Sequence, residues 1–382
     1  MLKKMLHRWR IPLLVITGVF LAAVARWPLL PFQNNDLTQA FIPWYDFIKN
    51  HGFLNAFQYK FSDYTPLYLH LLALTTLLPM DKLYAIKAVS LVFEGLAAGA
   101  VYKILRTHRA VIPAVYGGLL LLFTPTVVLN GAFWGQSDII YTTWILLSLL
   151  GLARGKNHLA FLFYGLALAT KPQAFFIAPF YILMVMLVPS LNFWYLLYLP
   201  VVYILTLVPS LAAGRSFWEM ITLPFYQSGR WPSLTLNAPN IYQWLPQTPQ
   251  MYQWFKVPGF ALTAAALLLF GFAAYERLHE QKRPPSFPQI IQLMLIISLI
   301  TPFCLPQMHE RYFFLADILS LLYIFCFPGR AWVYILITGC SLLSYFPFLF
   351  QHTVVPLPWL ALVLGGVLAF LLHAFWTDKS LP

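Results

Sequence analysis

Four short polar clusters interrupt an otherwise apolar chain, and their residue types suit acid–base chemistry and phosphate binding. They are Asn34-Asn35-Asp36, Trp134-Gly135-Gln136-Ser137-Asp138, Lys171-Pro172-Gln173 and Gln307-Met308-His309-Glu310-Arg311-Tyr312. The carboxylates of Asp36 and Asp138 are candidate catalytic groups, because a carboxylate can take a proton from a hydroxyl. Lys171, His309 and Arg311 are candidate phosphate ligands, since an arginine binds phosphate through two parallel hydrogen bonds.

Each of these residues also has a structural explanation, which the sequence leaves open. Asp36 and Asp138 precede apolar helical segments, and aspartate is a common N-cap. Lys171 lies between two short apolar segments, where a lysine is costly unless it meets an anion, such as a lipid phosphate, or extends to the membrane surface. Glu310 suits a salt bridge with Arg311 or Lys171. We expect supporting roles for Glu310 and for the nearby side chains Trp134, Gln136 and Gln173.

Common cofactor and metal motifs are missing from the sequence. It contains no P-loop and no GxGxxG motif, which disfavours a soluble nucleotide donor. The run His309-Glu310-Arg311 lacks the second histidine of the zinc motif HExxH. Cys304, Cys326 and Cys340 lie in apolar segments without CxxC spacing, which disfavours a disulfide framework. These motifs give no reason to expect a cofactor, and the sequence leaves assistance by a divalent ion open.

The composition is that of an integral membrane protein. Of the 382 residues, 60% are hydrophobic and 9% are charged, whereas about 25% of a soluble domain is charged. The net charge of +12 does not predict nucleic-acid binding, because the basic residues stand at the ends of apolar runs and form no stripe with aromatic side chains. Glu94 lies in the middle of the apolar run 83–104, so we expect it to pair with a buried polar group.

Apolar runs of about 20 residues, the length of a membrane-crossing helix, recur along the chain. We therefore predict an all-α polytopic membrane protein with about twelve transmembrane helices, at 11–30, 83–104, 111–130, 138–153, 158–170, 174–188, 193–212, 256–275, 287–304, 312–327, 331–349 and 355–376. The run 66–78 is too short to cross upright and is interpreted as a surface or re-entrant helix. The first run has the basic flank of a signal peptide, but it continues to Leu30, which favours an uncleaved helix.

Basic residues assign a side to each loop, because cytoplasmic loops are enriched in Lys and Arg. If 66–78 lies on the surface, the inside holds 14 Lys and Arg against 3 acids, and the outside holds 10 against 8. Both termini of this multi-pass plasma (inner) membrane protein are then cytoplasmic, and all four polar clusters are outside. Residues 1–212 would form a catalytic module with its first outer loop at 31–82, followed by an outer loop at 213–255 and a C-terminal transmembrane module at 256–382.

Taken in order, the polar motifs resemble those of the GT-C superfamily of integral-membrane glycosyltransferases. They are Asp36 after the first span, Asp63-Tyr64-Thr65-Pro66-Leu67-Tyr68, Trp-Gly-Gln-x-Asp at 134–138, Lys-Pro-Gln at 171–173 and Met-His-Glu-Arg-Tyr at 308–312. The nearest resemblance is to the dolichyl-phosphate-glucose glucosyltransferases and their bacterial homologues. It covers roughly residues 30–320, and the combination of motifs is more specific than any one of them.

The resemblance implies a GT-C-like fold with surface helices in the first outer loop. It also implies a metal-independent, inverting transfer of a hexose, glucose or mannose, from a polyprenyl-phosphate carrier to a glycan, lipid or protein acceptor. In that reaction Asp36 would be the general base and Asp138 a second acidic residue. Lys171, His309 and Arg311 would contact the donor phosphate.

Two other functions are compatible with the same residues. One is a transporter or flippase for a lipid-linked sugar, and the other is a polysaccharide polymerase or ligase that uses a lipid-diphosphate donor. A transporter should carry polar groups through both halves of the bilayer. The four clusters are instead expected on one side, so the sequence favours the enzyme while leaving the sugar, the acceptor and the exact lipid open.

Overall fold

The computed structural model describes residues 2–227 and 232–378, most of which are helical. The chain forms two compact units. Unit 1 comprises Met1–Lys171 and Val202–Ile221, and unit 2 comprises Pro172–Val201 and Thr222–Pro382. This division follows packing and differs from the boundaries at 212 and 255 suggested by the sequence. The boundaries at 212 and 255 separate a catalytic module, an outer loop and a C-terminal module, and this functional division stays a prediction.

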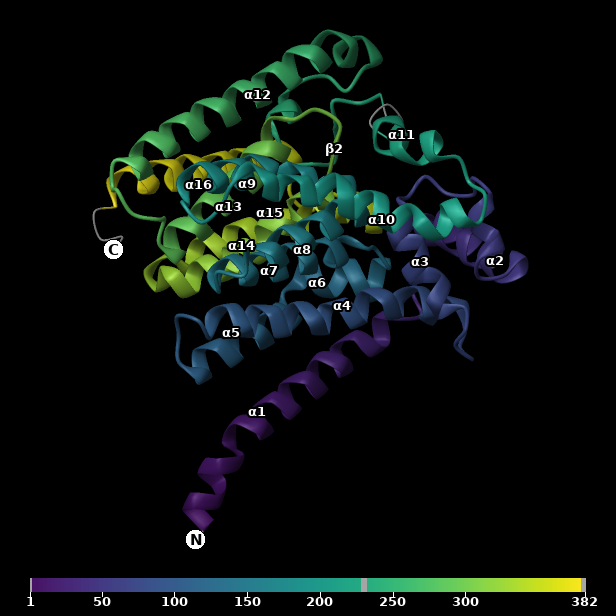
Figure 1. Cartoon of the computed structure of the whole chain (residues 1–382), viewed down its shortest axis with the longest axis horizontal. Helices are drawn as coiled ribbons and strands as arrows, with labels where there is room; N and C mark the ends of the chain where they lie inside the picture. The colour runs from purple at the N-terminus through teal and green to yellow at the C-terminus, as the bar shows by residue number, and fades with distance from the viewer. Residues whose placement is uncertain (1, 228–231, 379–382) are drawn as a thin grey trace. The chain divides into compact units, whose positions relative to one another are not determined.

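Unit 1 is built around helix α4, Lys82–Leu105, which packs against α5 and α7, while α7 packs against α8 (Figure 1). The other helices that begin in this unit are α1 (Leu2–Arg26), α2 (Ile42–His51), α3 (Pro66–Thr75), α5 (Val111–Phe123), α6 (Pro125–Val128), α7 (Asp138–Ala153), α8 (Asn157–Thr170) and α11 (Phe217–Gln227). Short 3₁₀ turns lie at Trp27–Leu29 and Asn55–Gln58, and π-helical turns at Leu37–Phe41 and Leu129–Trp134.

Unit 2 is centred on helix α13, Phe287–Cys304, which packs against α9, α12, α14 and α16. The other elements are α9 (Ala178–Leu187), α12 (Pro249–His279), α14 (Phe314–Cys326), α15 (Ala331–Phe350) and α16 (Leu357–Thr377), with 3₁₀ turns at Pro172–Ile177, Phe193–Leu197, Ile241–Trp244, Glu310–Phe313 and Pro328–Arg330. Strands β1 (Thr235–Leu236) and β2 (Met308–His309) pair in parallel. The helix α10, Tyr198–Ala212, is shared between the two units.

The chain has the helices of a polytopic membrane protein. In the described residues, seven helices are long and apolar enough to cross a membrane, or eight if the bent pair Val111–Phe123 and Pro125–Trp134 counts as one span. All twelve segments predicted as crossings are helical over most of their length. Several are short, such as α7, α8 and α9, so the count of twelve crossings stays a prediction.

Prolines set the breaks between these helices, because the residue before a proline is pushed out of the helical region. Thr124, before Pro125, has ψ 120°, and the two helices that meet there are bent by 48°. Lys171, before Pro172, is also extended, with φ −154° and ψ 129°, and α8 ends at Thr170. Lys171, which the sequence places between two short apolar segments, therefore lies at a break between two helices.

The segment between the first two long helices is largely helical. Helix α3 has ten residues, which is about 15 Å and roughly half the thickness of the hydrocarbon core. The expectation that 66–78 is too short to cross upright therefore agrees with its observed length.

The predicted outer loop 213–255 also contains defined structure. It holds α11, β1, the turn Ile241–Trp244 and the start of α12, which begins at Pro249 rather than at residue 256. The reason is local, since Thr248 caps this helix by accepting a hydrogen bond from the Met251 N–H and Pro249 occupies its first position.

Candidate functional site

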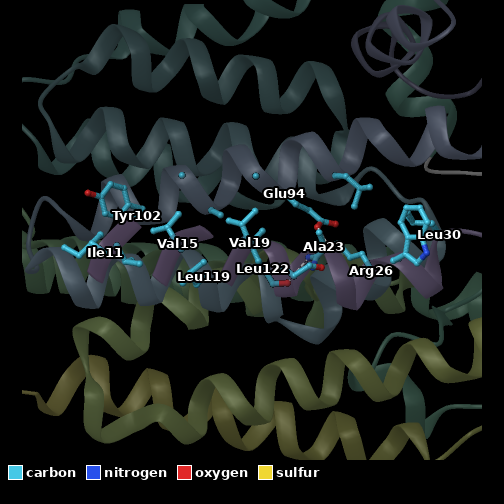
Figure 2. Close-up of a pocket in the computed structure, with 18 residues that line it drawn as sticks. Ile11, Val15, Val19, Ala23, Arg26, Leu30, Glu94, Tyr102, Leu119 and Leu122 are labelled. Carbon is cyan, nitrogen blue, oxygen red and sulfur yellow. Dashed lines mark hydrogen bonds and ion pairs between the residues drawn. The ribbon is translucent and has the colours of Figure 1, made fainter. Parts of the chain in front are cut away.

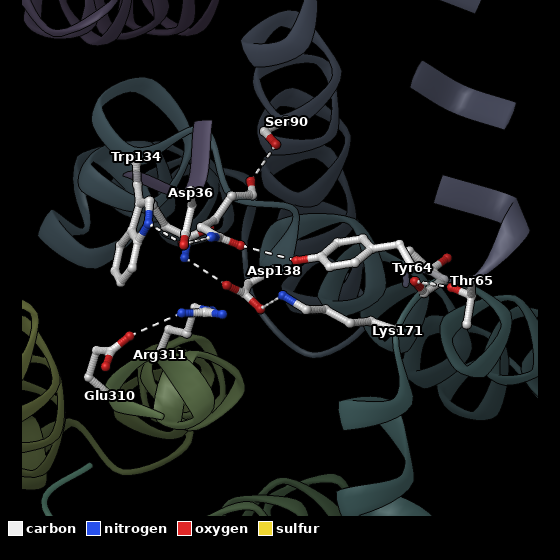
Figure 3. Close-up of polar contacts among 12 residues, drawn as sticks. Asp36, Tyr64, Thr65, Ser90, Trp134, Asp138, Lys171, Glu310 and Arg311 are labelled. Carbon is white, nitrogen blue, oxygen red and sulfur yellow. Dashed lines mark hydrogen bonds and ion pairs between the residues drawn. The ribbon is translucent and has the colours of Figure 1, made fainter. Parts of the chain in front are cut away.

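Asp36 lies in the turn after α1, and its carboxylate is held by two donors from one segment. Trp134 Nε1 donates to Asp36 Oδ2 at 2.9 Å, and Gln136 Nε2 donates to the same oxygen at 2.5 Å (Figure 3). Both donors are buried, whereas Asp36 is half-buried. Asp36 Oδ1 accepts no hydrogen bond from the described residues. One carboxylate oxygen is thus fixed and the other is open, which is the arrangement a general base needs.

The neighbouring Asn34, rather than Asp36, caps the helical turn that follows. The Leu37 N–H donates to Asn34 Oδ1 at 3.1 Å, and Asn34 Nδ2 donates to the Trp134 carbonyl at 2.8 Å. Asp36 makes no side-chain cap hydrogen bond. Asp36 stands at the N-cap position of this turn, but its side chain does not cap it, because Asn34 accepts from the helix and donates across to Trp134.

The turn at Gly135 brings Trp134 and Gln136 to the same carboxylate. Gly135 has φ +77°, a left-handed conformation that favours glycine. A Cβ atom there would also stand 2.9 Å from Leu37 Cδ2, so the close approach of the two segments requires a glycine. The π-helical turns Leu37–Phe41 and Leu129–Trp134 flank this contact, and such turns are frequent at functional sites.

The second carboxylate, Asp138, has a different environment. Lys171 Nζ donates to Asp138 Oδ1 at 2.5 Å, and Asn130 Nδ2 donates to Oδ2 at 2.9 Å. The Asp138 and Lys171 side chains are 1% and 5% exposed. Both oxygens of Asp138 accept hydrogen bonds and the group is buried, so it neutralises Lys171. Ser137 stands at the N-cap of α7 instead of Asp138.

Tyr64 and Thr65 join these two carboxylate sites to the first outer segment. The Tyr64 hydroxyl makes a long, 3.5 Å hydrogen bond to Gln136 Oε1, and its ring centroid lies 5.8 Å from Lys171 Nζ. Thr65 Oγ1 donates to the Thr170 carbonyl at 2.7 Å. The motif 63–68 carried little information in the sequence, but the structure places it against both Gln136 and Lys171.

Lys87 is a buried cation that the sequence analysis overlooked. Its ammonium is hydrogen-bonded to the carbonyls of Leu30 at 2.8 Å, Phe32 at 2.7 Å and Phe133 at 3.1 Å. It thereby ties the turn before Asp36 to the segment that contains Trp134. The signal was present, since a lysine inside the apolar run 83–104 needs a partner or a function.

The remaining predicted site residues belong to unit 2. Arg311 Nη1 donates to Glu310 Oε1 at 3.1 Å, and the Glu310 side chain is 1% exposed (Figure 3). His309 is half-buried and its ring packs 5.2 Å from Tyr312. Gln173 lies in the turn after Lys171, and its Oε1 is buried without a hydrogen-bond partner among the described residues. The salt bridge considered for Glu310 is thus formed with Arg311.

A two-stranded sheet fixes the backbone of His309. Thr235 pairs with Met308 and Leu236 with His309, and the Gln307 N–H donates to the Leu234 carbonyl at 2.8 Å. Asn237 and Gln307, beside this sheet, have left-handed φ values of 60° and 66°. Such strained residues gather at functional sites. Part of the outer loop 213–255, which matched no motif, therefore supports the His309 motif.

Tyr242 anchors the same loop. Its hydroxyl donates to the Cys304 carbonyl at 2.7 Å, and Asn240 Oδ1 accepts from the Tyr242 N–H at 3.1 Å. Burial raises the pKa of Tyr242 to about 12, so the phenol keeps its proton and remains a donor. The loop is thereby fastened to the end of α13 immediately before the His309 motif.

The structure thus gathers the predicted site residues in two groups. Asp36, Trp134, Gln136, Asp138 and Lys171 come together in unit 1, and Gln173, His309, Glu310 and Arg311 belong to unit 2. In residues 2–227 and 232–378, no three His, Cys, Asp or Glu side chains are close enough to hold a metal ion. Independence of a metal stays a prediction.

Comparison with models of protein families and with curated proteins finds no match to this chain.

Proposed function

We propose that this protein is an inverting glycosyltransferase of the GT-C type. It would move a hexose, glucose or mannose, from a polyprenyl-phosphate carrier to an acceptor hydroxyl on the extracytoplasmic side of the plasma membrane. The observation that supports this most directly is the environment of Asp36. Its Oδ2 is fixed by Trp134 and Gln136, and its half-buried carboxylate keeps Oδ1 open.

Asp36 acts in this proposal as the general base. Its Oδ1 takes the proton of the acceptor hydroxyl while the hydroxyl oxygen attacks the anomeric carbon of the sugar. The bond between that carbon and the phosphate oxygen breaks, and polyprenyl phosphate leaves with the electron pair. A single displacement of this kind inverts the configuration at the anomeric carbon.

Arg311 and His309 are assigned to the donor phosphate. Arg311 has five N–H donors in a planar fork, a geometry that suits the oxygens of a phosphate as well as the carboxylate of Glu310. Lys171 is also proposed as a phosphate ligand, because its ammonium is a cation with three N–H donors. Asp138 is then a positioning residue rather than a catalytic one.

The proposed membrane arrangement follows the charge distribution. Twelve crossings would leave both termini in the cytoplasm and carry the clusters around Asp36, Asp138, Lys171 and Arg311 to the outside. The excess of Lys and Arg in the loops assigned to the inside, 14 against 3 acids, supports this orientation.

The test uses the purified protein in liposomes that contain synthetic polyprenyl-phosphate glucose or mannose, with membrane extract as the source of acceptor. Release of polyprenyl phosphate is measured. Asp36→Asn keeps the shape of the side chain but removes the base, so turnover should fall about 10²- to 10⁴-fold, the usual contribution of such a group. Donor binding, measured separately, should persist.

Asp46→Asn is the matched control, because Asp46 lies in the same outer segment and is half-exposed in an ion pair of 2.6 Å with Lys82. It should retain turnover. Full turnover in Asp36→Asn would eliminate the general-base assignment. Movement of the labelled donor across the liposome membrane without release of polyprenyl phosphate would instead identify a transporter.

A further inference from the structure

A long apolar cavity of about 610 Å³ lies in unit 1 between α1, α4 and α5. Figure 2 shows its lining along α1 and the turn that follows it, from Ile11 and Val15 at one end to Arg26 and Leu30 at the other. From Ile11 to Leu30 the wall is roughly 28 Å long, at about 1.5 Å per residue. That length is close to the full hydrocarbon core of a bilayer, about 30 Å.

Two glycines form one side of the cavity. Gly95 and Gly99 stand about one turn apart on α4, and a Cβ atom built on either would meet no atom within 4 Å. In contrast, a Cβ on Gly118 would stand 2.8 Å from the Ala98 carbonyl oxygen, so Gly118 serves the packing of α4 against α5. The space over Gly95 and Gly99 is therefore open, and a ligand can approach the α4 backbone closely there.

A buried ion pair holds the C-terminal end of α1 against α4 and α5. Arg26 Nε donates to Glu94 Oε2 at 2.6 Å, and its other nitrogens donate to the carbonyls of Ala22 at 2.9 Å and Leu122 at 2.8 Å. Toward its N-terminus, α1 leans away from α5 (Figure 1). Because the guanidinium is already bound on all sides, the cavity offers its occupant an almost wholly apolar wall.

The Leu30 end of the cavity adjoins the segments that hold Asp36. The Leu30 carbonyl accepts from Lys87, which also binds the Phe133 carbonyl. Glu94 Oε1 lies against Gly131, where a Cβ atom would be only 2.0 Å away. A chain lying in the cavity would thus have one end next to the segment 131–136, which carries the two donors to Asp36.

We infer that this cavity holds the polyisoprenoid chain of a lipid carrier, with the phosphate end toward Leu30. The identity of the chain rests on the proposed function. The length of the wall favours it, because each acyl chain of a phospholipid occupies a single leaflet and would fill only half of the cavity. A single chain longer than one leaflet, such as a polyisoprenoid, can line the cavity from one end to the other.

The test blocks the cavity without disturbing its walls. Gly95→Leu and Gly99→Leu place a side chain in the open space, and Gly271→Leu on α12 is the control, since a Cβ there also meets no atom within 4 Å. The probe is polyprenyl phosphate with a photoreactive group in its chain, and the labelled peptides are mapped. Labelling of α1 and α4 should fall at least about tenfold in the two cavity variants, a loss of about 1.4 kcal/mol, and stay unchanged in the control.

Competition decides the identity of the occupant. Excess phospholipid should leave the labelling unchanged, and unlabelled polyprenyl phosphate should abolish it. Equal displacement by phospholipid, or equal labelling in Gly95→Leu and the wild type, would overturn the inference.

Kinetics separate this inference from the proposed function. The ratio of kcat/KM for a full-length donor to that for a short-chain analogue should fall about tenfold in Gly99→Leu and stay constant in Gly271→Leu. A constant ratio in both variants would remove the chain site and leave the glycosyltransferase standing. Specific labelling of the cavity in a protein that turns over neither donor would support the chain site and remove the glycosyltransferase.

Discussion

Asp138 and Lys171, 33 residues apart in the sequence, form a buried ion pair with a distance of 2.5 Å between Oδ1 and Nζ. The pair connects the first residue of α7 to the residue that follows α8. Two charges taken out of water gain little net stability from one another, but each becomes very costly when its partner is removed. This asymmetry makes the pair testable.

Lys171→Met should destabilise the protein by about 3–5 kcal/mol, because Asp138 then loses its cation in a buried site. The double variant Asp138→Asn/Lys171→Met should recover most of that loss, since neither charge remains. Thermal unfolding in detergent measures both effects. A single variant as stable as the wild type would show that the pair contributes nothing to the fold.

The same double variant separates structure from function at Lys171. If Lys171 contacts the donor phosphate, the folded double variant should have a raised KM for the donor, because the ammonium is missing. Wild-type KM and kcat in a folded double variant would confine Lys171 to the role of counter-charge for Asp138. The measurement is the steady-state release of polyprenyl phosphate.

Trp134→Phe should lower kcat about 10- to 100-fold with a smaller change in KM. The substitution removes the indole N–H that donates to Asp36 Oδ2 at 2.9 Å and keeps an aromatic ring in the buried space. A hydrogen bond to a charged group contributes about 1.5–3 kcal/mol, and about 1.4 kcal/mol corresponds to a tenfold change in rate. Thermal unfolding should show that the variant is folded, and an unchanged kcat would mean that the indole does not position the base.

Gly131→Ala should be strongly destabilising although it adds one methyl group. The new Cβ would lie 2.0 Å from Glu94 Oε1, so the carboxylate that accepts from Arg26 at 2.6 Å would have to shift. Breaking a buried ion pair costs about 3–5 kcal/mol. Gly339→Ala on α15, where a Cβ meets no atom within 4 Å, is the control and should be neutral or stabilising by up to about 1 kcal/mol. Equal unfolding temperatures for the two variants would contradict the prediction.

His70 on α3 should make the stability of unit 1 depend on pH. Burial lowers its pKa to about 4 from an ordinary value of 6.5. Its ring packs 4.6 Å from Phe57, and its Nε2 lies 3.3 Å from Ser210 Oγ. Between these two pKa values the unfolded chain binds a proton that the folded protein does not, so stability is complete above pH 6.5 and falls as the pH drops toward 4.

The loss should be no more than about 3.5 kcal/mol, from about 1.4 kcal/mol per pKa unit. His70→Gln removes the titration and should flatten the dependence of the unfolding temperature on pH over this range. His51→Gln is the control, because His51 is exposed at the end of α2 and its replacement should leave the slope unchanged. A slope retained in His70→Gln would assign the pH dependence to another group.

The sequence alone determined the helices and their breaks. Apolar runs of membrane length became helices such as α4, α13 and α16, because a backbone without water satisfies its hydrogen bonds most simply within a helix. The two short apolar segments on either side of Lys171 became separate helices, and the short run at 66–78 became the ten-residue helix α3. The pairing of Glu94 was also expected, since a buried charge needs a partner. All these properties depend on residues close together in the chain.

The hydrogen bonds and ion pairs between distant polar groups depend on the tertiary structure. Asp36 is held by Trp134 and Gln136, about 100 residues away, and Glu94 found Arg26 rather than another cation. Lys171 forms an ion pair with Asp138, whereas the sequence suggested a lipid phosphate as its partner. Local patterns specify that a charge in an apolar chain must be neutralised, but the choice of partner depends on how distant helices pack. For that reason the sequence predicted the site residues. The fold distinguishes their two carboxylates, because Asp36 accepts hydrogen bonds at one oxygen and Asp138 accepts them at both.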